Sequence, residues 1–166
     1  MTEHAVLFLD FDGVLHPGDV YLVKGKPVLR RDGIALFEWV SLLEEALLPY
    51  LDQVDIVLST TWVAILGLDE AKRFLPEALQ KRVIGATFDG SHEPQVWGTL
   101  PRCTQIQIAA KRLACDRWIA VDDDTDGWNP EFVEQLVAID PDLGLAEAGR
   151  VEELQRKLKQ VLTLKK

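Results

Sequence analysis

The sequence has few of the residues that build disulfide frameworks or zinc sites. Its 166 residues include only two cysteines, Cys103 and Cys115, and three histidines. The cysteines lack the C-x-x-C spacing of a zinc ligand pair, and no paired histidines accompany them. The sequence therefore does not fit a zinc site, and we expect both cysteines to be ordinary reduced thiols.

Long hydrophobic runs are also missing. No stretch approaches the roughly 18 consecutive apolar residues that are needed to span a bilayer. The start of the chain, Met1 to Ala5, lacks the charge pattern of a signal peptide. We therefore expect no membrane association and a cytoplasmic protein.

Positive charge is scarce, with 18 lysines and arginines against 27 aspartates and glutamates and a formal net charge of −9. Such a chain repels phosphate backbones, so extended non-specific binding to nucleic acid is not expected, although the end of a nucleic acid is an admissible substrate. Hydrophobic residues make up 48% and charged residues 27% of the chain. This is a globular composition, and the length suits one compact domain over residues 1–166.

Short apolar runs alternate with amphipathic stretches along the chain. The runs predict buried strands, because a strand covered on both faces of a parallel sheet is apolar throughout. Residues 20–28 predict a small hairpin, which we call the flap, turning at residues 24–26. The predicted strands are Ala5–Leu9, Val54–Leu58, Val83–Ala86, 118–121 and 136–139.

Amphipathic stretches predict helices between these strands. One helix is expected to be capped by Asp32 and to end at Pro49. Others are expected at residues 69–79, around 106–113, and over a closing stretch with a basic end at Lys165 and Lys166, whereas residues 88–102 show no period and predict a long loop. Strands alternating with helices imply an α/β fold: a three-layer, Rossmann-like parallel sheet with helices on both faces.

Polar residues follow three of the predicted strands. Asp10 and Asp12 follow the first, Ser59 and Thr60 the second, and Asp122 and Asp123 come at the end of the fourth. In such sheets ligands bind beyond the carboxyl ends of the strands, so these side chains are expected to share one crevice. Crowded carboxylates repel one another unless a cation lies between them, and Mg²⁺ prefers such oxygen ligands.

These residues also carry a family resemblance. The string Asp10-Phe11-Asp12-Gly13-Val14-Leu15 resembles the first motif of haloacid-dehalogenase-like (HAD) phosphohydrolases. Ser59 resembles the second motif and the pair Asp122-Asp123 the fourth, in the family's order. The strings LFLDFDGVLHP and IVLSTTW are most similar to small HAD domains of nucleic-acid repair proteins. The spacing leaves room for the flap but for no large cap domain.

The resemblance implies a role for each motif residue. Asp10 would be a nucleophile that forms an aspartyl-phosphate, and Asp12 an acid and base. Ser59, Thr60 and a cationic third-motif residue would bind the phosphoryl group. For that cation we favour Arg102, which precedes a predicted helix, over Lys111 within it. The implied Mg²⁺ ligands are Asp10, Asp12, Asp122 and Asp123.

The resemblance thus implies a phosphomonoester hydrolase whose substrate is a phosphorylated metabolite or a nucleic-acid end. The alternative is a HAD-shaped module that binds phosphate or a partner without turnover. A calcium-binding loop starting at Asp122 is disfavoured, because its twelfth position is Val133 instead of glutamate. Trp62, Trp97 and Trp128 lie near the expected crevice and are expected to pack rather than stack on substrate. His16 is not assigned to the site.

Overall fold

A five-stranded parallel sheet forms the centre of the protein, whose computed structural model describes residues 4–164. The strand order is β5-β4-β1-β6-β7, so β1 is central and β4 and β6 flank it. The predicted Lys165 and Lys166 lie outside the described residues. The strands are β1 Ala5–Leu9, β4 Val54–Leu58, β5 Val83–Ala86, β6 Trp118–Asp122 and β7 Leu136–Ala138.

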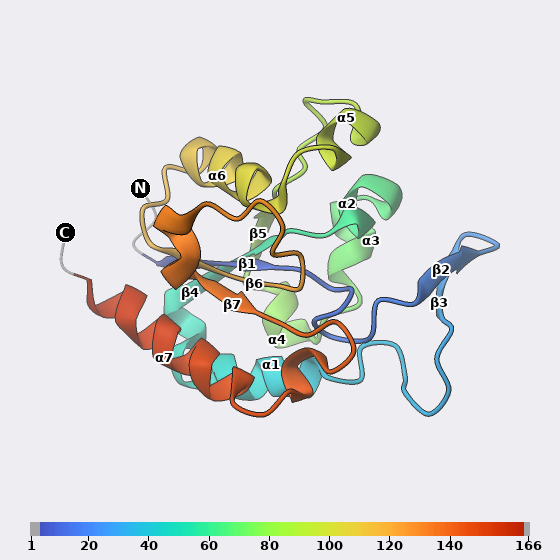
Figure 1. The fold of residues 1–166 in the computed structure, drawn as a ribbon, viewed down its shortest axis with the longest axis horizontal. Coiled ribbons are helices and arrows are strands. Elements are labelled where there is room, and N and C mark those ends of the chain that lie inside the picture. The colour runs from blue at the N-terminus through green and yellow to red at the C-terminus, as the bar shows by residue number, and fades with distance from the viewer. Residues whose placement is uncertain (1–3, 165–166) are drawn as a thin grey trace.

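Helices cover both faces of this sheet (Figure 1). Successive residues of a strand point to opposite faces, and β1 shows this clearly. Leu7 and Leu9 belong to a core shared with α1 (Val40–Leu47) and α7 (Arg150–Thr163). Val6 and Phe8 belong to a second core shared with α6 (Arg102–Arg112). The predicted three-layer α/β fold is confirmed.

The flap is a two-stranded antiparallel sheet of β2 (Val20–Val23) and β3 (Lys26–Leu29) that projects from the main body (Figure 1). Its turn lies at Lys24 and Gly25, which both have positive φ angles, 50° and 77°. Such a turn matches the right-handed twist of the flanking strands. No large cap domain covers the sheet within residues 4–164, as the spacing predicts.

The first helix begins later than the sequence predicts. Asp32 does not cap it, because turns occupy residues 32–33 and 36–39 and α1 starts at Val40. Phe37 has a φ of 59°, which interrupts any helix there, and its ring packs edge-on against Phe11 and Trp62. Burying this ring therefore outweighs continuing the helix. Helix α1 ends before Pro49, as predicted, and a 3₁₀ helix, Leu48–Gln53, follows.

Other helices also differ from prediction. The helix predicted at 69–79 is two short ones, α3 (Leu68–Lys72) and α4 (Glu77–Gln80), because Pro76 stands between them. Helix α2 (Thr61–Leu66) was not predicted, and α5 (Pro94–Gly98) lies within the predicted loop 88–102. Short 3₁₀ helices occupy Pro130–Gln135 and Gly144–Ala146. No helix in residues 4–164 has the length and apolarity needed to cross a membrane.

Candidate active site

Three neighbouring strand ends meet around Asp10. The backbone N–H of Asp10 donates to the carbonyl oxygen of Val121 on β6, at 3.3 Å. On the other side, the backbone N–H of Ser59 donates to the carbonyl oxygen of Leu9, at 2.7 Å. The loop after β1 therefore lies between the ends of β4 and β6, and the residues that follow these strands line one crevice.

An acidic cluster forms at this edge. Asp10, Asp122 and Asp123 each offer a carboxylate oxygen, and these atoms lie within 4.8 Å of one another. Burial, followed by the charge of Asp122, raises the pKa of Asp10 well above its ordinary value. Burial also raises the pKa of Asp122 from 3.8 to about 7, and that of Asp123 in the same direction.

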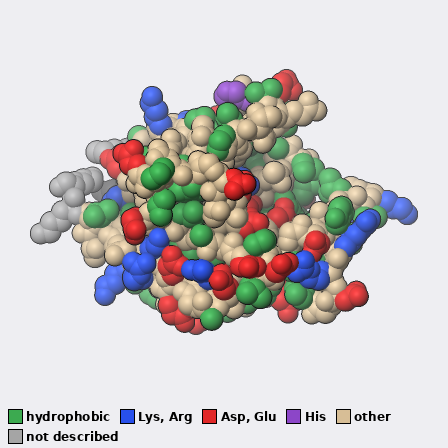
Figure 2. Space-filling model, viewed as in Figure 1, with side chains coloured by type: hydrophobic (Ala, Val, Ile, Leu, Met, Phe, Trp, Pro, Cys, Tyr) green, Lys and Arg blue, Asp and Glu red, His purple; other side chains and the backbone are tan. Residues whose placement is uncertain are grey.

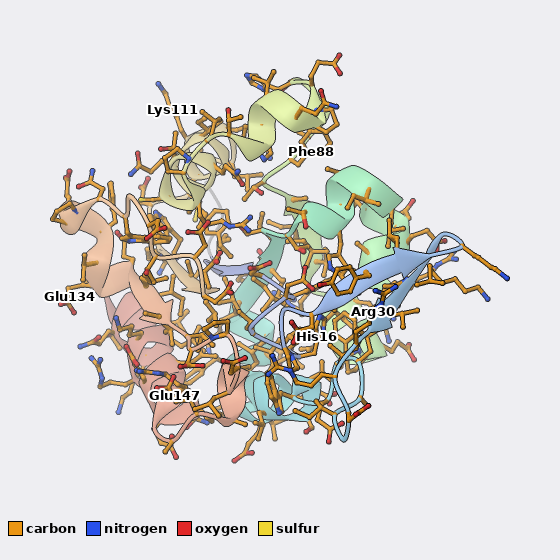
Figure 3. All side chains as sticks on the ribbon, turned by 45° about the vertical axis from the view of Figure 1, so that its right-hand side comes forward. His16, Arg30, Phe88, Lys111, Glu134 and Glu147 are labelled. Carbon is orange, nitrogen blue, oxygen red and sulfur yellow. The ribbon has the colours of Figure 1, made fainter. Side chains whose placement is uncertain are left out.

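Arg102, the first residue of α6, faces these acids. Its Nη2 lies 3.7 Å from Asp10 Oδ2, and its Nε lies 3.1 Å from Asp122 Oδ2, without the alignment of a hydrogen bond. Burial lowers the pKa of Arg102, but Asp10 and Asp122 more than offset this and the net pKa is raised. Lys111 lies near the other end of α6, is exposed, and points outward (Figure 3). The structure thus brings Arg102, and not Lys111, to the acids.

The cluster fits a divalent cation. Asp122 Oδ2 is buried and has no hydrogen-bond partner among residues 4–164. One guanidinium faces several carboxylates, so negative charge remains in excess when all of them ionise. A hard cation bound by these oxygens would remove the mutual repulsion that burial intensifies, and Mg²⁺ suits carboxylate ligands.

Ser59 and Thr60 occupy the end of β4 and are both buried. Ser59 Oγ has no hydrogen-bond partner within the described chain, so this hydroxyl is free to donate to a bound anion. Thr60 Oγ1 accepts a hydrogen bond from the backbone N–H of Trp62 at 3.3 Å and caps α2. Its oxygen therefore has a structural role, while its hydroxyl hydrogen is still available to a ligand.

Asp12 is held by two ring nitrogens. His16 Nε2 lies 2.9 Å from Asp12 Oδ1, and Trp62 Nε1 donates to Asp12 Oδ2 at 2.9 Å. The backbone N–H of Phe37 donates to His16 Nδ1, so the hydrogen of a neutral His16 ring is on Nε2 and points at Asp12. The fully buried His16 is visible in Figure 3 below the flap. We call this arrangement the Asp12 clamp.

Sequence reasoning missed the clamp. It left His16 unassigned and expected Trp62 to pack, which it does with an exposed fraction of 5%, but it did not pair the indole N–H with Asp12. The available signals were the spacing of Asp12 and His16 and the position of Trp62 directly after the second motif. Trp97 is also buried, against Phe88.

Gly13 allows this loop to approach the acidic cluster. Its φ is 76°, and a Cβ atom there would lie within 2.4 Å of Asp123 Oδ2. Its backbone N–H donates to the carbonyl oxygen of His16 at 2.8 Å, which closes the turn behind Asp12. Any side chain at this position would push Asp123 away from Asp10.

A family described as the HAD domain in Swiss Army Knife RNA repair proteins matches residues 6–149. The chain belongs to this family. Neither the comparison with curated proteins nor that with solved structures gives a match. The resemblance to HAD domains of nucleic-acid repair proteins is thus confirmed, and membership supports a phosphatase-like function for this HAD domain.

Asp124 and Asp126 follow the acidic cluster in the sequence but do not belong to it. Both side chains are exposed. The carboxylate oxygens that lie within 4.8 Å of one another belong to Asp10, Asp122 and Asp123, and not to these two residues. The backbone N–H of Asp124 donates to Asp122 Oδ1 at 3.0 Å, so this segment forms a local turn at the end of β6. This arrangement differs from a calcium-binding loop, whose ligands come from one continuous segment.

Proposed function

We propose that this HAD domain is a magnesium-dependent phosphomonoester hydrolase that acts through an aspartyl-phosphate on Asp10. One observation carries the proposal: a buried carboxylate, two further carboxylates and a guanidinium converge at the ends of adjacent parallel strands. A carboxylate nucleophile needs nearby positive charge, both to be ionised and to approach an anionic phosphate. Arg102 supplies part of that charge.

In the first step, an oxygen of Asp10 attacks phosphorus and the bond from phosphorus to the ester oxygen breaks. Asp12 gives its proton to the departing oxygen, so the leaving group departs as a neutral alcohol. Ser59 Oγ and Arg102 bind the non-bridging oxygens, where negative charge develops. We assign the hydroxyl of Thr60 to the same group of phosphate donors.

In the second step, Asp12 removes a proton from a water molecule that attacks the phosphorus of the intermediate. The bond from phosphorus to the Asp10 oxygen breaks, which releases inorganic phosphate and returns both aspartates to their starting states. Bound Mg²⁺ would neutralise charge on the phosphoryl oxygens. The side chains of Asp10, Asp122 and Asp123 and the backbone carbonyl of Asp12 would hold it.

The substrate is a phosphorylated metabolite or a nucleic-acid end. The described chain has no cap domain over the strand ends, and an open crevice admits a bulky leaving group. Hydrolysis of a generic aryl phosphate in the presence of Mg²⁺ tests the proposal. Absence of turnover with every divalent metal tried, together with retained binding of inorganic phosphate, would favour the non-catalytic binding module.

Arg102 and Lys111 form a matched pair of cations on one helix. Arg102→Gln is expected to lower kcat for an aryl phosphate by about 10²-fold, because a charge that stabilises the phosphoryl oxygens is lost. Lys111→Gln removes an exposed charge and is expected to change kcat by less than about twofold. Steady-state kinetics with saturating Mg²⁺ compare the two variants. An equal loss in both would show that Arg102 is not the phosphate-binding cation.

A further inference from the structure

A hollow with a cavity volume of about 90 Å³ lies between the flap and α2, next to the proposed active site. The flap and α2 both lie on the same side of the molecule in Figure 1. The hollow is lined by Asp12, Val20, Tyr21, Leu22, Pro27, Thr61, Trp62, Ile65 and Leu66.

Asp12 connects this hollow to the chemistry. Its carboxylate is the group that gives a proton to the departing ester oxygen, so the leaving group must lie on the side of Asp12 away from Asp10. The three acids of the acidic cluster do not line the hollow, whereas Asp12 does. The Asp12 clamp fixes this carboxylate between the hollow and the acidic cluster. The hollow is therefore placed to hold the leaving group.

Exposed apolar side chains line part of the hollow. Tyr21 and Leu22 of the flap are 51% and 49% exposed, and Ile65 of α2 is 58% exposed. Figure 2 shows green side chains along the flap and blue ones toward its outer end. Exposed apolar side chains on two facing elements favour an apolar ligand between them, because burying their surface is favourable.

Tyr21 gives the flap wall an aromatic surface. The guanidinium carbon of Arg30 lies 4.7 Å from the centroid of its ring, so a cation–π contact supports the ring from one side. Arg30 lies directly after β3, at the base of the flap (Figure 3). An aromatic side chain held in this way is a stacking surface for a planar group.

We propose that the hollow between the flap and α2 binds a planar aromatic ring carried by the leaving group, and that Tyr21 and Ile65 are its specificity-determining residues. This inference rests on the proposed function, since it uses the direction in which Asp12 donates its proton. It selects aryl and nucleoside phosphates over phosphates of ring-free alcohols. The shared chemistry is a flat apolar ring within a few bonds of the ester oxygen.

Two matched substrate pairs test this inference. Benzyl phosphate and ethyl phosphate release primary alcohols and differ by the ring. Adenosine 5′-monophosphate and ribose 5-phosphate release the same type of primary hydroxyl and differ chiefly by the base. For each pair, kcat/KM is measured with Mg²⁺ for the wild type, Tyr21→Ala, Tyr21→Phe, Ile65→Ala and the control Ile84→Ala, which alters an exposed apolar residue on β5.

The ring-bearing member of at least one pair is expected to be preferred by the wild type. Tyr21→Ala is expected to lower kcat/KM for that member by roughly tenfold and to leave the ring-free member nearly unchanged, as loss of one stacking partner predicts. Tyr21→Phe and Ile84→Ala are expected to retain the preference, and Ile65→Ala to weaken it. The pair that shows the effect identifies whether the ring is a simple aryl group or a nucleobase.

Failure of this inference differs from failure of the proposed function. If ring-free and ring-bearing substrates are turned over equally, or if Tyr21→Ala lowers kcat/KM equally for both, the hollow is not a ring site although the enzyme is a phosphatase. If no member of either pair is turned over, equilibrium binding of phenylphosphonate against methylphosphonate gives a second measurement. Equal binding of the two, or a preference unchanged in Tyr21→Ala, would overturn the ring site without reference to catalysis.

Discussion

Asp10→Asn is expected to reduce kcat for any phosphate ester by at least ~10³-fold, because the amide cannot form the aspartyl-phosphate. The same substitution is expected to raise the thermal stability of the metal-free protein near pH 8. Burial and the charge of Asp122 raise the pKa of Asp10, so its ionised form is costly in the folded state and asparagine removes that cost. Kinetics with saturating Mg²⁺ and thermal denaturation in EDTA measure the two effects.

Asp126→Asn is the matched control for this experiment. Asp126 belongs to the same acidic run after β6 but is exposed and lies outside the acidic cluster. It is expected to change kcat by less than about twofold and the unfolding free energy by less than about 0.5 kcal/mol. Turnover by Asp10→Asn comparable to that of this control would rule out Asp10 as the nucleophile.

A second large effect is expected in the pH dependence of stability. Burial raises the pKa of Asp122 from 3.8 to about 7 in the folded protein. A carboxyl group with a higher pKa in the folded state stabilises the fold when protonated, so its contribution is complete below about pH 4 and is lost as the pH rises through 7. For the metal-free protein this loss amounts to roughly 4 kcal/mol, and Mg²⁺ is expected to reduce it by favouring the carboxylate.

Comparison with Asp122→Asn isolates this contribution from the other carboxyl groups. The variant does not ionise at this position, so its unfolding free energy relative to the wild type is expected to increase between pH 5 and pH 8 in EDTA. Adding Mg²⁺ at pH 8 is expected to stabilise the wild type more than the variant, because the variant has lost a ligand. Denaturant unfolding at several pH values measures both differences. Parallel curves for the two proteins would show that Asp122 does not titrate in this range.

The sheet was predictable from the sequence because its signals are local. Buried parallel strands are continuous apolar runs, and β1, β4 and β5 have the predicted bounds. The residues around Asp10, Ser59 and Asp122 could also be placed, since parallel strands deliver their carboxyl ends to one edge of the sheet. Arg102 was harder to place, because a position at the start of a helix says nothing about what the side chain faces.

What could not be predicted depends on tertiary packing. The late start of α1 follows from the positive φ of Phe37, whose ring is buried against side chains far away in the sequence. The Asp12 clamp likewise joins Asp12 to Trp62 across fifty positions. Helix α2 is short, and its sequence carries no long amphipathic period. In each case the deciding contact is made only in the folded chain.

The Asp12 clamp has a consequence for how substrate range can change in this protein. Its His16 and Trp62 rings rest on Phe37, and Phe74 packs on Phe37 and Trp62. Packing in the protein interior thus fixes the orientation of Asp12, the proton donor. The flap lies on the solvent side of Asp12. Selection or engineering can therefore reshape the flap for a new leaving group and keep the proton-transfer geometry intact, so specificity and catalysis can evolve separately.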